Sequence, residues 1–348
     1  HALSTGGSTD FKEHGRGRLK KNGAVAVPKI FDEVKKLREI WSSFRQARVL
    51  ISANNYRIFD RLIAPKTADT ISKELHIDLR ATEILLDALT GIGLLNKRKD
   101  EYRNGKLASR FLVYGRPYYQ GDIIRHADTL WKNWSELDEV VKTGKPSRKA
   151  YNQEAFVLGM HNLASLKVKD VIKKIGLKGV RRALDLGGGP GTYSMEMAKK
   201  GVDVSLIDYP ETIEIAKRII GKDVVEDINF ISGDFMTDDI GKGYDLIFIS
   251  QILHAYSEKD NLRILKRCKE ALNDGGRIVV QEFYIDNSRI YPPQAALFSV
   301  NMLVNTERGR CYSPDEIKGW FLEAGMRNIK KILADDTVLI SGVKGPQA

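Results

Sequence analysis

The stretch Ala183-Leu-Asp-Leu-Gly-Gly-Gly-Pro-Gly-Thr192 decides the fold. Its apolar start predicts a short buried strand, and its glycines predict a sharp turn into a helix that begins near Thr192. Glycine accepts positive φ angles and lets a ligand approach the backbone, because it has no Cβ. Ligands of parallel α/β sheets bind at the carboxyl ends of the strands. We therefore expect an α/β domain with a ligand loop at Gly187 and Gly189.

The acid in this stretch indicates which ligand the loop binds. Dinucleotide folds use the pattern G-x-G-x-x-G and direct a helix N-terminus at a pyrophosphate, but the sixth position here is Thr192. Asp185 lies two residues before Gly187, where its carboxylate repels a pyrophosphate. The same carboxylate suits the cationic sulfonium and amino-acid end of S-adenosylmethionine. The pattern therefore predicts S-adenosylmethionine as the cofactor.

Two further acids end the next two predicted strands. Asp208 follows Ser205-Leu-Ile, where it is placed to accept hydrogen bonds from both ribose hydroxyls. Asp234 ends the third strand and is placed to accept the adenine amino group, with Phe235 beside the ring. Each acid alone also fits a helix N-cap or a turn. Acids at three successive strand ends favour the binding interpretation.

Apolar strand-like runs alternate with amphipathic helices from Arg181 onwards. This alternation predicts a parallel sheet with helices on both faces, and thus a Rossmann-like seven-stranded domain over residues 179–348. The expected strands are Ala183–Leu186, Val202–Ile207, Ile228–Ile231, Tyr244–Ser250, Gly276–Glu282, Ile329–Ala334 and Thr337–Val343.

Three parts precede this domain. Residues 1–27 are rich in glycine, serine and charge, which predicts a disordered leader. Residues 28–110 predict a mainly α domain of helices followed by a small β-wing, including a helix over Trp41–Leu62 and a hairpin over residues 97–107. That order is typical of a winged-helix-like fold. Residues 111–178 predict a helical linker whose aromatic side chains line the substrate.

Composition excludes several classes of protein. The only two cysteines, Cys268 and Cys311, do not make a disulfide framework, and the leader has no hydrophobic segment, so we expect a cytoplasmic protein. No apolar run approaches the ~18–20 residues of a membrane helix. The six histidines lack the H-x-x-H or H-E-x-x-H spacing of metal sites, so no metal is expected.

The net charge of +11 is concentrated in residues 1–110. A basic winged-helix domain is typical of proteins that bind nucleic acid, so nucleic acid is one candidate partner. However, the presumed recognition helix carries Arg80 followed by Glu83 and Asp87, whereas DNA-reading helices present more Arg, Lys, Asn or Gln. A lysine-rich solvated surface is the favoured interpretation.

Further motifs complete a resemblance to a known family. Asp208-Tyr-Pro210, Gly233-Asp-Phe235, Ile252-Leu-His-Ala-Tyr-Ser257 and Gly275-Gly276 accompany the glycine loop. Together they resemble the small-molecule O-methyltransferases of the plant caffeate/flavonoid, hydroxyindole and bacterial polyketide type. The resemblance implies a homodimer through the N-terminal domain, which lids the partner's pocket, and an aromatic small-molecule acceptor. The implied cofactor residues are Asp185, Gly187, Gly189, Asp208, Tyr209, Gly233, Asp234, Phe235, Ser250 and Gln251; many plant members carry Lys-Trp at the last two positions.

The resemblance also implies the catalytic and acceptor residues. His254 matches the general base, and a base accelerates attack by a phenol whose pKa is near 10. Glu282 and Glu307 are the acids expected to orient His254, although in one alignment Cys311 replaces Glu307. Ala255 stands where plant members have Asp. The implied acceptor residues are Trp134, Phe156, Met160, His161, Asn301 and Met302.

Three alternatives remain open at this point. The same fold and cofactor also serve methylation of carbon, as on tetrapyrrole pigments, and some resembling proteins bind the cofactor without transferring a methyl group. A winged-helix nucleic-acid binder is the third alternative. The acceptor itself depends on side chains from several helices and is not predicted.

Overall fold

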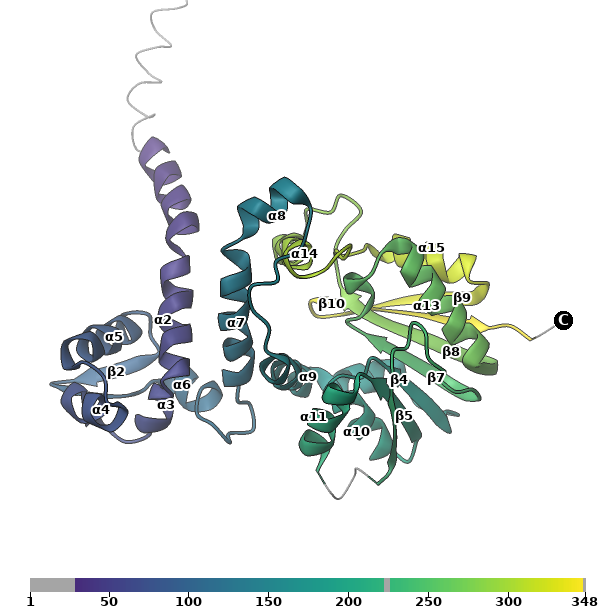
Figure 1. Ribbon diagram of the computed structural model, residues 1–348, viewed down its shortest axis with the longest axis horizontal. Helices are drawn as coiled ribbons and strands as arrows, with labels where there is room; N and C mark the ends of the chain where they lie inside the picture. The colour runs from purple at the N-terminus through teal and green to yellow at the C-terminus, as the bar shows by residue number, and fades with distance from the viewer. Residues whose placement is uncertain (1–28, 222–225, 347–348) are drawn as a thin grey trace, which may run out of the picture.

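The computed structural model describes residues 29–221 and 226–346. The leader predicted at residues 1–27 lies outside this range. A small helical domain stands at one side of the molecule and a large sheet at the other (Figure 1). Between them lie α7 (Gly121–Trp134), α9 (Gln153–Ile175) and α14 (Pro293–Asn305). Within the described residues, no helix combines the length and the apolar character that a membrane span requires.

The large sheet contains all seven predicted strands in the order β6-β5-β4-β7-β8-β10-β9. Neighbours from β6 to β8 pair in parallel, whereas β10 is antiparallel to both β8 and β9. The predicted fold class, a mixed α/β protein with a mostly parallel sheet behind a helical domain, is confirmed. The strands are β4 (Arg182–Leu186), β5 (Asp203–Asp208), β6 (Ile228–Ser232), β7 (Tyr244–Ser250), β8 (Leu272–Phe283), β9 (Met326–Ala334) and β10 (Thr337–Lys344).

Helices cover both faces of this sheet, because alternate strand residues point to opposite faces. On one face α9 and α10 (Thr192–Ala198) pack on β4, β7 and β8, with Ile172 and Phe248 in the buried core. On the other face α13 (Glu258–Ala271) and α15 (Pro314–Glu323) pack around Ile249 and Phe321. α11 (Pro210–Ile220) contacts β5 and β6 near the edge of the sheet.

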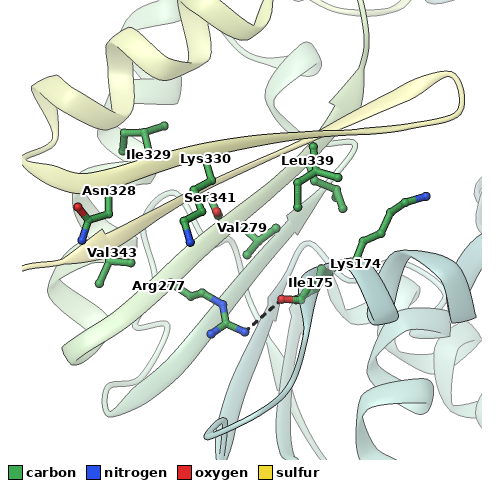
Figure 2. A pocket seen from close by; sticks show the side chains of 11 residues that line it. Lys174, Ile175, Arg277, Val279, Asn328, Ile329, Lys330, Leu339, Ser341 and Val343 are labelled. Atoms are coloured by element: carbon green, nitrogen blue, oxygen red, sulfur yellow. Dashed lines mark hydrogen bonds between the residues drawn. The ribbon is translucent and has the colours of Figure 1, made fainter.

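The face that α9 and α10 cover continues past the end of α9 as an open groove over β8, β10 and β9 (Figure 2). Arg277 lies at the end of the groove next to α9, where its guanidinium donates to the carbonyl oxygens of Ile175 and Gly176 at the C-terminus of that helix. The predicted site residues are not among those that line this groove. The ligand site must therefore be sought at the carboxyl ends of the strands.

The N-terminal domain is helical with a small sheet in the order β1-β3-β2. Thr67 and Asp78 cap two of its helices, because their side chains accept hydrogen bonds from the backbone N–H groups of Thr70 and Ala81. The predicted hairpin is present as β2 and β3. The elements of this domain are α2 (Phe44–Asn55), α3 (Ile58–Arg61), β1 (Lys66–Thr67), α4 (Ala68–Leu75), α5 (Leu79–Gly91), β2 (Leu95–Arg98), β3 (Glu101–Asn104) and α6 (Lys106–Phe111). Further along the chain, α8 (Leu137–Thr143) contacts α14.

The single helix predicted over Trp41–Leu62 is wrong in detail. A helix at residues 29–42 ends in a turn at Ser43, and a second break separates α2 from α3. At that break Arg57 adopts a left-handed conformation with φ 53°, and its guanidinium pairs with Asp60 at 2.6 Å. The apolar spacing continues through the break because both helices face one core, so periodicity alone did not reveal it.

Candidate functional site

The predicted ligand loop is built as the glycine pattern requires. Gly187, Gly189 and Gly191 all have positive φ angles, between 53° and 70°. A Cβ at Gly187 would lie 2.6 Å from Ile252 Cδ1, so no larger residue fits there without displacement. A Cβ at Gly189 would meet no atom within 4 Å, so this glycine faces open space. A ligand can therefore approach the backbone of this loop at Gly189 without meeting a Cβ atom.

Asp208 lies directly beside this loop, at the end of β5. Its Oδ2 accepts from Gly189 N at 2.9 Å and its Oδ1 accepts from Tyr209 N at 2.7 Å. Burial raises the pKa of this carboxyl, while these backbone donors oppose the rise. Each carboxylate oxygen keeps a further acceptor position. Asp208 is therefore held firmly and still has capacity for ligand hydroxyls.

The segment after β6 adds a third acid and an aromatic ring. Asp234 Oδ1 accepts from Met236 N at 2.8 Å, which leaves Oδ2 available on a half-buried side chain. Gly233 accommodates Asp238, since a Cβ there would lie 2.8 Å from Asp238 Oδ2. Phe235 is buried and packs edge-on against Tyr256 at 5.8 Å between ring centroids.

The structure corrects the role expected for Asp185. This residue is only 1% exposed, and its Oδ2 accepts from Ser194 Oγ at 2.6 Å. It lies beneath the loop, where a Cβ on Gly188 would be 3.0 Å from Asp185 Cγ. Burial raises the pKa of its carboxyl to about 6. Asp185 therefore supports the turn from below and does not line the open side of the loop.

Ser250 and Gln251 follow β7 at the same edge of the sheet. Gln251 has a strained backbone with φ 59°, and its N–H donates to the carbonyl oxygen of Gln281 at 2.8 Å. Its side-chain Nε2 is buried without a hydrogen-bond partner in the described part of the chain. Ser250 Oγ donates to Gln281 Oε1 at 3.0 Å. Gln281 was not predicted, although a polar residue inside an apolar strand was a signal for it.

His254 and Glu282 form a buried pair. His254 lies in the short turn η1 (Leu253–Ala255), and its Nδ1 is 2.7 Å from Glu282 Oε2. Glu282 Oε1 also accepts from the backbone N–H of His254 at 3.3 Å. Glu282 is 2% exposed, so water competes little for this carboxylate. The pair leaves His254 Nε2 as the ring nitrogen without a protein partner among the described residues.

The second acid predicted for His254 does not reach it. Glu307 is exposed and its Oε1 pairs with Arg148 at 2.5 Å. Cys311 instead lies buried near the pair, and its backbone N–H donates to Ser299 Oγ at 3.1 Å. Burial raises the pKa of the Cys311 thiol to about 11, with the charge of Glu282 adding to the rise. Glu307 does not reach His254 because the chain after α14 directs Cys311 into the core and Glu307 to the surface.

Aromatic rings enclose the histidine. Phe298, from α14, packs edge-on against the imidazole at 5.1 Å between centroids, and Phe283 lies at 6.0 Å. One turn further along α14, Asn301 accepts a hydrogen bond from Trp134 Nε1 at 2.8 Å, which joins α14 to α7. Met302 is buried in the same helix. The wall beside His254 is therefore apolar with one polar position.

The remaining predicted acceptor residues lie on α9. Phe156 packs edge-on against His126 at 5.3 Å between centroids, and Met160 is half-buried. His161 Nδ1 is 2.9 Å from Thr192 Oγ1, at the start of α10. Burial lowers the pKa of His161. The structure thus ties His161 to the ligand loop, while Phe156 stands over the contact of α7 with α9.

Comparisons with known proteins agree with this architecture. The sequence model of the O-methyltransferase domain matches residues 134–327, and that of the O-methyltransferase dimerisation domain matches residues 39–114. The 3-hydroxy-5-methyl-1-naphthoate 3-O-methyltransferase of Streptomyces sahachiroi is 30% identical over 312 residues, which cover 85% of this chain and 90% of that protein.

Two solved structures are similar over nearly their whole length. PigF with S-adenosylhomocysteine superposes with a TM-score of 0.83 at 27% identity, covering 89% of this chain and 99% of that one. Human N-acetylserotonin methyltransferase in complex with S-adenosylmethionine also gives 0.83, at 24% identity, covering 90% and 98%. At that identity the second match supports the fold alone. The chain belongs to the O-methyltransferase family and is an S-adenosylmethionine-dependent O-methyltransferase.

Proposed function

We propose that this enzyme methylates a phenolic hydroxyl of an aromatic small molecule and that His254 is the general base. The observation that carries the proposal is the buried contact of 2.7 Å between His254 Nδ1 and Glu282 Oε2. A carboxylate that accepts from Nδ1 fixes the tautomer in which Nε2 keeps its lone pair. The edge-on contact with Phe298 holds the ring from the side.

The residues around the loop fit S-adenosylmethionine. Gly189 leaves room for a ligand, Asp208 has acceptor capacity for two ribose hydroxyls, and the orphaned Gln251 Nε2 is a donor suited to a carboxylate or ring nitrogen. Asp234 and Phe235 would bind the adenine, and His161 would support the loop through Thr192. When bound, the cofactor supplies an electrophilic methyl group on a positively charged sulfur.

The chain's own residues would act on the acceptor hydroxyl. His254 Nε2 would take the phenolic proton while the hydroxyl oxygen receives the methyl group that S-adenosylmethionine would supply. Glu282 stabilises the imidazolium that results, because its charge is buried beside Nδ1. The proton leaves Nε2 to water after the product departs. Holding the hydroxyl in line with the methyl group is the larger contribution, about 7–11 kcal/mol for well-oriented reactants.

The acceptor wall supports an aromatic substrate. Phe283, Phe298 and Phe156 present ring faces and edges, which pack well against flat apolar molecules. The naphthoate named for the Streptomyces sahachiroi relative is a hydroxylated aromatic compound. We infer that the acceptor of this enzyme belongs to the same chemical class.

We also infer a homodimer through a winged-helix-like N-terminal domain. A stripe of large apolar side chains runs along the helix at residues 29–42 and into α2, and all of its members are exposed in the single chain. Exposed apolar patches of this kind mark interaction surfaces, and the dimerisation-domain match begins within the stripe, at residue 39. The stripe consists of Ile30, Phe31, Val34, Leu37, Ile40, Trp41 and Phe44.

Methyl transfer tests the proposed function directly. The purified enzyme is incubated with S-adenosylmethionine carrying a labelled methyl group and a panel of naphthols, hydroxynaphthoates and hydroxyindoles. Transfer of the label to a phenolic oxygen, and its loss in His254→Ala with cofactor affinity retained in calorimetry, supports the proposal. A product labelled on carbon, or full turnover in the variant, contradicts it.

A further inference from the structure

The groove over β8, β10 and β9 contains a cation that has no carboxylate partner in the described part of the chain. Arg277 lines this groove and is half-buried. Its Nη2 donates to the carbonyl oxygens of Ile175 and Gly176, which leaves the donors on Nε and Nη1 without a protein acceptor among the described residues. Burial lowers the pKa of this guanidinium, because a charge that is removed from water and not paired is unfavourable. An anion in the groove would supply the missing partner.

The strand register places a second cation on the same face of the sheet. Val279 pairs with Ser341 and Ser341 pairs with Lys330, so these three side chains form one row across β8, β10 and β9. Arg277 belongs to the neighbouring row, because side chains two residues apart on a strand share a face. Lys330 is exposed, and Figure 2 shows its side chain extending from β9 towards β8. The two cations therefore stand on either side of β10, with adjacent strands ~4.8 Å apart.

The surroundings of the two cations suit a carboxylate. Ser341 lies on β10 between their strands, and a hydroxyl can donate to an anion. Among the described residues that line the groove, none is acidic. Lys174 also lines it but pairs with Asp170 one turn earlier in α9 and points away from this space in Figure 2. The uncompensated positive charge is thus concentrated at Arg277 and Lys330.

The rest of the groove is aliphatic. Leu339 on β10 pairs with Ile332 on β9 in the row after Ser341, and Ile332 is 41% exposed. Along β10 the distance from Val343 to Leu339 is ~13 Å, at about 3.3 Å per residue. The described lining contains no aromatic side chain, although aromatic faces are the usual partners of flat aromatic ligands. An aliphatic chain therefore suits this surface better than a ring system.

The size of the groove is that of a small-molecule site. Its volume is about 580 Å³, within the ~300–1,000 Å³ that is usual for such sites. Eleven residues line it, whereas a stable protein interface takes about 20–30 residues on each side. We therefore consider a small amphiphile and not a docked protein as the occupant.

We propose that this groove binds a free aliphatic carboxylate, with the carboxylate group between Arg277 and Lys330 and the chain along Leu339 and Ile332. The site is separate from methyl transfer, because the residues assigned to the cofactor and the acceptor do not line the groove. The inference is therefore independent of the proposed function.

The first test compares three head groups on one aliphatic chain. Calorimetry measures the binding of decanoate, decanol and decylammonium, each below its micelle concentration, to the full chain saturated with S-adenosylhomocysteine. Decanoate should bind about tenfold more tightly than decanol, since hydrogen bonds to charged groups are the stronger ones, and decylammonium should bind least. Equal affinity for decanoate and decanol would overturn the inference.

Substitutions then locate the bound carboxylate. Lys330→Gln should weaken decanoate binding about two- to fivefold, the contribution of an exposed ion pair, and Arg277→Gln should weaken it about tenfold. Lys331→Gln is the matched control, because Lys331 follows on the same strand and points to the opposite face; it should bind decanoate as the wild type does. A loss in Lys331→Gln as large as in Lys330→Gln, or no loss in Lys330→Gln and Arg277→Gln, would place decanoate elsewhere and refute the site.

A reversed charge gives a result that does not depend on Arg277→Gln being stable. Lys330 is exposed, so Lys330→Glu should fold as the wild type does, which denaturant unfolding checks. This variant should lose decanoate affinity and gain affinity for decylammonium. If Lys330→Glu keeps the wild-type order of the three ligands, the carboxylate does not lie beside Lys330 and the inference fails.

Discussion

The pairing of His254 with Glu282 leads to a graded loss of activity in two variants. Glu282→Gln keeps the size of the side chain and an oxygen for Nδ1, but it removes the negative charge. Hydrogen bonds to charged groups contribute about 1.5–3 kcal/mol and neutral ones about 0.5–1.5 kcal/mol. The imidazolium formed during transfer therefore loses about 1–1.5 kcal/mol of stabilisation, which lowers kcat about 5–15-fold. His254→Ala removes the base and should lower kcat about 10²–10⁴-fold.

The assay measures kcat at saturating S-adenosylmethionine on a series of phenols of increasing acidity. A base is needed only while the hydroxyl keeps its proton, so the deficit of both variants should shrink as the phenol becomes ionised at the assay pH. Glu307→Gln is the matched control, because Glu307 pairs with Arg148 on the surface and does not contact His254. It should retain wild-type kcat on every phenol.

Two results would refute this reasoning. Wild-type kcat in Glu282→Gln would mean that the carboxylate does not assist the imidazole. A deficit in His254→Ala that stays constant across the phenol series would mean that the histidine positions the acceptor without taking its proton. Calorimetry with S-adenosylmethionine checks that neither variant has lost the cofactor site.

Three further predictions concern the cofactor, stability and assembly. Asp208→Ala should weaken S-adenosylmethionine binding about 10²-fold in calorimetry, since two hydroxyls lose a charged partner; unchanged affinity would remove Asp208 from the site. The raised pKa of Asp185, about 6, means that the folded state favours the protonated form, so its burial costs stability as pH rises from about 4 to about 6. Asp185→Asn should therefore be more stable at pH 7 by up to about 3 kcal/mol in denaturant unfolding, with the gain vanishing towards pH 4; a less stable variant at pH 7 would contradict this. Leu37→Glu with Trp41→Glu should convert a dimer to a monomer in light scattering, whereas Leu333→Glu, an exposed leucine of β9, should not; a dimer that survives the double change would place the interface elsewhere.

Much of the fold was predictable because it depends on local signals. Short apolar runs predict the strands, and the glycines from Gly187 to Gly191 predict the turn, each from a few neighbouring residues. Once the strands are placed, Asp208 and Asp234 are found at or just after the ends of two of them. A parallel sheet then brings those ends to one edge. This is why the three-acid pattern and the seven strands could be predicted without knowledge of tertiary contacts.

The direction in which each side chain points was less predictable. Asp185 belongs to the same acid pattern, yet it faces Ser194 beneath the loop and not the ligand side. The role predicted for Glu307 was wrong because 53 residues separate it from His254, and only the path after α14 shows that Cys311 is buried there and Glu307 is exposed. The hydrogen bond from Trp134 Nε1 to Asn301 Oδ1 joins residues 167 apart, and no local pattern in the sequence predicts it.

The position of β10 has a consequence for synthesis on the ribosome. This strand is the last of the seven to be translated, yet it lies between β8 and β9. A nascent chain that ends before Thr337 leaves β8 with an open edge and β9 with no strand to pair with. Open edges of this kind attract other chains. The sheet can close only after residues 337–344 have emerged, so we expect stalled or truncated chains to depend on chaperones far more than the finished protein does.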